Sequence, residues 1–288
     1  MLLDVLKDTL TDTLKLIPFL YITYLLMEWL EERAQEKTIS MLQRARLLGP
    51  IVGAATGVIP QCGFSAAAAS MYSGGVITVG TLLAVFLSTS DEMLPIFISE
   101  QVNIKTIVSV IGTKIILGAI SGLIVDAFLR VYRRKHPRTD RHIHDLCEQD
   151  NCHCEEGNIF LSAFLHTIEI TIFILIITFL AGLAIEGIGE ERVGAFLSGE
   201  PLLGVALSGL IGLIPNCGAS VTITELYLKG ILTSGQMMTG LLIGAGVGLL
   251  ILFRSDRRHM KDNIKITIAL YLIGVFWGLV IDRLGIVF

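Results

Sequence analysis

One short motif occurs twice, as Ile59-Pro60-Gln61-Cys62-Gly63 in the first half of the chain and as Ile214-Pro215-Asn216-Cys217-Gly218 in the second. Both copies interrupt an apolar stretch, over residues 47–72 and 202–227. Proline removes a backbone donor and breaks a helix, and glycine permits the turn that follows. Each copy therefore predicts a broken helical hairpin that carries a Pro-x-Cys-Gly tip.

The similarity extends beyond the two tips, because a shift of 155 residues also aligns their surroundings. Self-similarity at a fixed spacing indicates an internal repeat. The matched pairs include Gly57 and Gly212, Ser65 and Ser220, Tyr72 and Tyr227, Gly75 and Gly230, Thr78 and Thr233, and Gly80 and Gly235.

The composition is that of a membrane protein. The 288 residues are 53% hydrophobic and 17% charged, with a mean hydropathy of +0.72, whereas a soluble chain carries about 25% charged residues. This excludes a disordered or collagen-like chain and argues against a soluble enzyme. A spanning helix needs about 20 apolar residues, and an all-α polytopic membrane protein is therefore predicted. The qualifying stretches are residues 12–30, 76–98, 104–130, 159–185, 236–253 and 264–283.

Basic residues concentrate in three loops, 31–46, 133–158 and 254–263. The positive-inside rule makes these loops cytoplasmic in a multi-pass protein of the inner (plasma) membrane. The hairpins then enter from opposite sides, either as re-entrant hairpins or as pairs of short crossing helices. An arm of about 10 residues, or about 15 Å, reaches half of a hydrocarbon core of about 30 Å, which favours the re-entrant form. We therefore predict two inverted-topology membrane repeats, residues 1–132 and 159–288, joined by a His/Cys-rich cytoplasmic linker.

Oppositely oriented repeats whose broken helices meet at the midplane are typical of secondary transporters that work by alternating access. The alternative is that the repeat records a gene duplication and only stabilises a membrane scaffold. Irregular backbone at lipid depth is tolerated only where it lines a cavity or is buried in protein. This constraint favours the transporter.

The two tips supply most of the predicted substrate-binding residues. Broken helices leave backbone groups and partial charges facing the site, and Cys62 and Cys217 add thiols, which suit thiophilic metals and metalloids. The alternative is that both cysteines are small packing residues. The binding residues predicted at the tips are Gln61, Cys62, Gly63, Ser65, Asn216, Cys217, Gly218 and Ser220.

A polar run, Ser88–Glu92, interrupts an otherwise apolar span. Charges within a membrane are costly and indicate function by default. Ser90, Asp91 and Glu92 are therefore predicted to bind substrate, with the two acids as metal ligands for a cation such as Mn(II), or as proton carriers. The alternative places both acids at the outer interface. The matching stretch of the second half, Gly244–Gly248, contains no acid, so the predicted site is asymmetric.

Four further ionisable residues lie in apolar segments and are candidates for coupling: Lys114, His166, Glu169 and Glu225. Histidine titrates near neutral pH, so His166 is suited to couple proton flow to transport. The alternative is internal salt bridging, for example between Glu169 and Lys114.

The linker concentrates potential metal ligands. Histidine and cysteine suit zinc and other soft-to-borderline metals, although the spacing is not that of a zinc finger. Metal sensing or delivery and a solvated linker both stay open. No resident cofactor, ATP-binding P-loop or nucleic-acid partner is predicted, and the sequence allows a homodimer. The predicted linker ligands are His142, His144, Cys147, Cys152, His153 and Cys154.

Together, the duplicated tips, the acidic segment Thr89–Glu92 and the His/Cys-rich loop followed by His166-Thr167 resemble the ten-span heavy-metal exporters, which are also described as arsenic efflux proteins or manganese transporters. The resemblance covers residues 10–283. It implies export of a metal or metalloid ion, such as Mn(II) or arsenite, from the cytoplasm.

Three rival functions stay open. Re-entrant hairpins also suit small organic anions, because helix N-termini favour negative charge. A membrane-embedded enzyme could use Cys62 or Cys217 as a nucleophile on a thiol or lipid. A channel-like pore would show no proton coupling. We predict a proton-coupled secondary exporter and no enzymatic activity.

Overall fold

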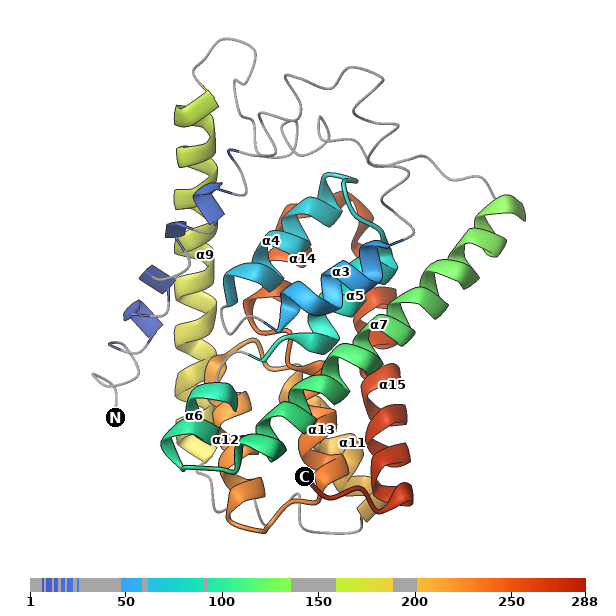
Figure 1. Cartoon of the computed structure of the whole chain (residues 1–288). Coiled ribbons are helices and arrows are strands. Elements are labelled where there is room, and N and C mark those ends of the chain that lie inside the picture. Colours follow the sequence, from blue (N-terminus) through green and yellow to red (C-terminus); the bar gives the residue numbers. More distant parts are fainter. Residues whose placement is uncertain are drawn as a thin grey trace.

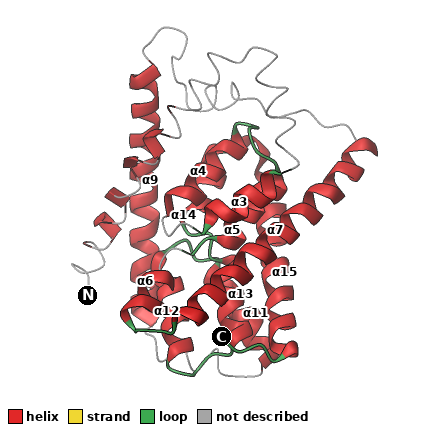
Figure 2. Cartoon of the chain, in the orientation of Figure 1, coloured by secondary structure: helices red, strands yellow, loops and turns green. Residues whose placement is uncertain are grey.

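The structure is a computed structural model of the chain. It describes scattered residues between 7 and 25, and residues 48–58, 62–90, 93–135, 159–188 and 201–288. Every regular element in these ranges is a helix (Figure 2). The predicted all-α class is therefore confirmed for the described part of the chain.

Within the described ranges, four helical segments are long and apolar enough to cross a membrane, and they confirm four of the predicted spans. A fifth predicted span, 159–185, coincides with the 30-residue helix α9, Ile159–Ile188. The predicted span 12–30 lies largely outside the described residues. The four segments are Val79–Ser99, Ile104–Tyr132, Ser234–Ser255 and Arg257–Leu284.

Two of these four spans are broken near their middle. Val79–Ser99 consists of α5 (Val79–Ser88) and α6 (Met93–Ser99), and the chain is already non-helical at Thr89 and Ser90. Ser234–Ser255 consists of α13 (Ser234–Ile243) and α14 (Val247–Ser255). Between α13 and α14, Gly246 has a φ of 52°, a conformation that side chains disfavour and glycine permits.

Two pairs of short helices accompany the broken spans. The first pair is α3 (Gly49–Gly57) and α4 (Cys62–Ser73), and the second is α11 (Pro201–Gly212) and α12 (Cys217–Leu228). A 12-residue helix such as α12 rises only about 18 Å, at about 1.5 Å per residue. No helix of either pair can therefore cross a bilayer alone.

Helices α5 and α13 form the centre of the molecule. Every residue of α13 is buried, and so are the residues of α5 from Gly80 to Ser88. Helices α3 and α7 (Ile104–Lys135) pack on α5, while α11 and α15 (Met260–Leu284) pack on α13. Figure 1 shows that α7 rises from the level of α6 and α12, whereas α15 descends from the level of α14 to the C-terminus.

The second helix of each broken span packs against a short helix that accompanies the other span. Helix α14 packs against α4, and α6 packs against α12. In Figure 1, α3, α4 and α14 therefore lie in the upper part of the molecule, and α6, α11 and α12 in the lower part.

A carboxylate on each long helix anchors the beginning of a central helix. Asp126 of α7 accepts hydrogen bonds from the Thr78 hydroxyl (2.5 Å) and from the Gly80 amide (2.8 Å) at the start of α5. Asp282 of α15 accepts the equivalent bonds from Thr233 (2.9 Å) and Gly235 (2.8 Å) at the start of α13. Both carboxylates satisfy amides that a helix N-terminus leaves unpaired, and they complement its partial positive charge.

Glycines let the long helices touch the central ones. A Cβ atom added to Gly122 of α7 would lie 2.4 Å from the carbonyl oxygen of Gly80, and one added to Gly278 of α15 would lie 2.7 Å from that of Gly235. Real Cβ atoms do not approach backbone so closely, so each crossing depends on the missing side chain.

We expect Gly122→Ala to lower the free energy of unfolding by about 1–3 kcal/mol, because the methyl group overpacks the crossing with α5. Gly112, on the same helix, has open space around its Cβ position. Gly112→Ala should therefore be neutral or stabilising by up to about 1 kcal/mol, the difference in helix propensity. Thermal unfolding in detergent measures both, and equal unfolding temperatures would contradict the close crossing.

Asp126→Asn and Asp282→Asn should each destabilise the protein by about 1–3 kcal/mol. Each variant loses hydrogen bonds to a charged acceptor and places a side-chain NH₂ where the threonine hydroxyl or the glycine amide needs an acceptor. Lys265→Gln is the control, since its pair with Asp262 is a surface pair in which Lys265 is 65% exposed, and such pairs contribute about 0–1 kcal/mol. Unfolding temperatures that do not separate the two aspartate variants from this control would argue against the anchoring role.

Candidate functional site

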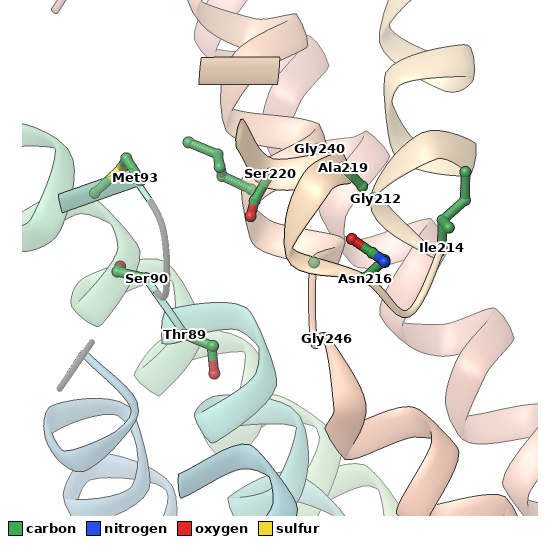
Figure 3. Close-up of a pocket in the computed structure, with 12 residues that line it drawn as sticks. Thr89, Ser90, Met93, Gly212, Ile214, Asn216, Ala219, Ser220, Gly240 and Gly246 are labelled. Carbon is green, nitrogen blue, oxygen red and sulfur yellow. The ribbon is translucent and has the colours of Figure 1, made fainter. Parts of the chain in front are cut away.

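A pocket lies where the two broken spans meet the turn between α11 and α12. It holds about 410 Å³ of empty space, including its open mouth. Figure 3 shows the side chains that surround it. The lining residues are Thr89, Ser90, Met93, Gly212, Ile214, Asn216, Ala219, Ser220, Gly240, Leu241, Gly244 and Gly246.

Helix ends form the walls of this pocket. One side comes from the connection between α5 and α6, and the other from the α11–α12 turn with the first turns of α12 (Figure 3). Helices α5, α11 and α13 end here, while α6, α12 and α14 begin here. Each end leaves backbone groups without a partner inside its helix. The pocket therefore lies among the ends of these helices, and Thr89, Ser90, Asn216 and Ser220 are the polar residues of its lining.

Asn216 fixes the turn between α11 and α12. As the N-cap of α12, its side-chain oxygen accepts from the Gly218 amide at 2.6 Å, and its side-chain NH₂ donates to the Thr178 carbonyl of α9 at 2.9 Å. The carboxamide oxygen retains a second lone pair. Asn216 thus positions the start of α12 against α9 and still offers an acceptor to a ligand.

Lys114 of α7 lies behind the pocket, and its side chain is fully buried. Its Nζ donates to the Thr89 carbonyl and, at 2.9 Å, to the Leu241 carbonyl. Thr89 is the C-cap of α5, and Leu241 lies in the last turn of α13. One ammonium group therefore contacts the C-terminal ends of both central helices, where a cation is favoured.

The two hairpins differ in their relation to the pocket. The second contributes Asn216 and Ser220, but no described residue of the first lines it. Ser65, the counterpart of Ser220, is fully buried. It packs against α14, where a Cβ added to Gly248 would lie 2.9 Å from the Ser65 Cβ. Gly63 is buried as well.

The structure brings together three of the predicted binding residues, Ser90, Asn216 and Ser220. Glu225, predicted for coupling, pairs with Lys229 at 3.2 Å on α12, and its role in coupling stays a prediction. Among the described residues, no three His, Cys, Asp or Glu side chains gather as a metal site would require.

The other predicted ligands stay predictions. Cys62, Cys217, His166 and Glu169 have a described backbone, in α4, α12 and α9, but their side chains lie outside the described part. Residues wholly outside it are Gln61, Asp91, Glu92, His142, His144, Cys147, Cys152, His153 and Cys154.

Some lining residues carry little sequence signal. Thr89 belongs to the polar run Ser88–Glu92 and Met93 follows it directly, so both could have been predicted from that run. Gly240 and Leu241 sit within a fully buried helix. Both line the pocket, and the Leu241 carbonyl also accepts from Lys114. A backbone acceptor leaves no trace in side-chain patterns.

Comparison with known proteins bears on this site. The family described as "Putative, 10TM heavy-metal exporter" matches residues 2–188, which is more than half of the chain and includes α3–α9. No curated protein and no solved structure matches the chain. The resemblance predicted from the sequence is thereby confirmed. The chain belongs to this family of heavy-metal exporters and is an integral membrane protein.

Proposed function

We propose that the protein exports a heavy-metal cation or a metalloid from the cytoplasm as a secondary transporter. The observation that carries this proposal is the pocket at the breaks of both spans, to which Ser90, Asn216 and Ser220 contribute polar groups. Broken helices whose ends face a common site are the way in which secondary transporters bind ions within the membrane. Membership of a metal-exporter family supports the class of substrate.

Alternating access would follow from two repeats of opposite topology. The repeat is supported by helix bounds, since the shift of 155 residues carries α4 onto α12 and α5 onto α13 with the same first and last residues. The two carboxylate anchors, Asp126 and Asp282, also occupy corresponding places. The opposite directions of α7 and α15 in Figure 1 support the inversion.

Residues next to the described lining would complete the donor set. Asp91 and Glu92 follow Ser90 in the sequence, and Cys217 follows Asn216. Carboxylates with hydroxyl and amide oxygens suit Mn(II), whereas thiols suit arsenite. We assign these residues as ligands, His166 and Glu169 to proton coupling, and the 133–158 linker to metal capture on the cytoplasmic side.

Flux into proteoliposomes tests the function. Mn(II), Zn(II), Co(II) and arsenite are supplied in parallel, with and without a pH gradient. We expect flux of one ion, increased by the gradient, and at least tenfold lower in Asp91→Asn for a divalent cation or in Cys217→Ser for arsenite.

Glu100→Gln is the control, because Glu100 is an exposed acid just after α6. It should transport at the wild-type rate. Absence of flux for all four ions would instead favour the carrier of small organic anions.

Ser220→Ala should raise the KM for the transported ion about fivefold, the effect of losing one interaction of about 1 kcal/mol. Thr222→Ala is the matched control on the same helix. Thr222 is buried, donates to the Gly218 carbonyl at 2.8 Å and does not line the pocket. A KM that rises equally in both variants would mean that the helix, and not the pocket, is affected.

A further inference from the structure

We propose that the Lys114 ammonium is a built-in cation, which occupies the position that a dissolved coupling cation would take between α5 and α13. The inference concerns how transport is coupled and so rests on the proposed function, but the site itself is defined by hydrogen bonds and burial. With this ammonium in place, transport requires neither sodium nor potassium.

The acceptors of Lys114 are carbonyls that the helix breaks release. In a continuous helix the Leu241 carbonyl would accept from the amide of Ala245. That amide instead donates to the Ile243 carbonyl at 2.7 Å, because the chain turns at Gly244. The Leu241 carbonyl is therefore available to Lys114 Nζ. At the other break, the Thr89 carbonyl accepts from the same ammonium.

The electrostatics of this position favour a cation. Each helix C-terminus carries a partial negative charge of about half an electron charge, and two such ends converge on one point. In transporters with broken helices, unwound carbonyls and half-helix C-termini of this kind coordinate a monovalent ion. Here the position is filled by a side chain that is fully buried, and a buried ammonium persists only where acceptors surround it.

A single cation serves both central helices. The shift of 156 residues that pairs Asp126 with Asp282 places Leu270 of α15 opposite Lys114 of α7. Leu270 is apolar and fully buried, so the corresponding position of the second half carries no cation. Lys114 thereby ties the break of one span to the break of the other, and neither helix end can move without changing a contact of this ammonium.

The test uses the purified full chain in detergent and compares Lys114→Ala, which leaves a gap and removes the charge, with Lys114→Met, which removes the charge and fills the gap. Thermal unfolding is followed while Na⁺, K⁺ or ethylammonium replaces N-methylglucamine at constant ionic strength. Lys105→Ala is the control, since Lys105 is exposed on the same helix.

We expect the unfolding temperature of Lys114→Ala to rise by several degrees, saturably, with a small cation or with ethylammonium, because a ligand that binds only the folded state stabilises it. Wild type, Lys114→Met and Lys105→Ala should not respond. A folded Lys114→Ala without any cation response, or one that responds no more than Lys105→Ala, overturns the proposal.

A second measurement covers a Lys114→Ala variant that does not fold. Ion flux by the wild-type protein should be unchanged when Na⁺ and K⁺ are replaced by N-methylglucamine, and an absolute requirement for either ion overturns the proposal. The unfolding experiment needs no transported ion. Failure of the metal-export function would therefore appear in the flux assay and leave the cation response of Lys114→Ala intact.

Discussion

A chain that interrupts a helix inside a bilayer must find partners for the backbone groups that the interruption frees, because lipid offers none. In this protein side chains supply partners, and several of these side chains also contact a second helix. Lys114 donates to carbonyls at the ends of α5 and α13, and Asn216 connects the start of α12 to the Thr178 carbonyl of α9. These bonds hold the ends of the helices in place. The pocket lies at these ends, so the site depends on the way in which the broken backbone is satisfied.

The two central helices are held by charges of opposite sign at their two ends. At their N-termini stand the carboxylates of Asp126 and Asp282. At their C-termini stands the ammonium of Lys114, shared between them. This order matches the direction of the helix dipole in both cases. The acidic anchors belong to one helix each and hold α5 and α13 separately, whereas the basic anchor is common to both and joins them.

The helical class, four spans and the family could be predicted from the apolar stretches, the duplicated tips and the polar run Ser88–Glu92. These features are patterns of side chains, which can be read directly from a sequence. Ser90, Asn216 and Ser220 line the same pocket, which agrees with the expectation that the broken segments face one site. The different fates of Ser65 and Ser220 could not be predicted, since they occupy equivalent positions. Ser65 is covered because Gly248 lets α14 approach it closely. The acceptors of Lys114 could not be predicted either, because they are main-chain carbonyls and one of them belongs to a helix far along the sequence.

The crosswise packing of α4 against α14 has a consequence for biosynthesis. More than half of the chain lies between Cys62–Ser73 and Val247–Ser255, so α4 leaves the ribosome long before the helix that covers it exists. At about 5–20 residues per second, the delay is roughly 10–40 s. During that interval the buried serines of α4, Ser65, Ser70 and Ser73, lack their final surroundings. The first hairpin therefore lacks its final packing partner during this interval. The early spans enter the bilayer well before the interior of the protein is complete.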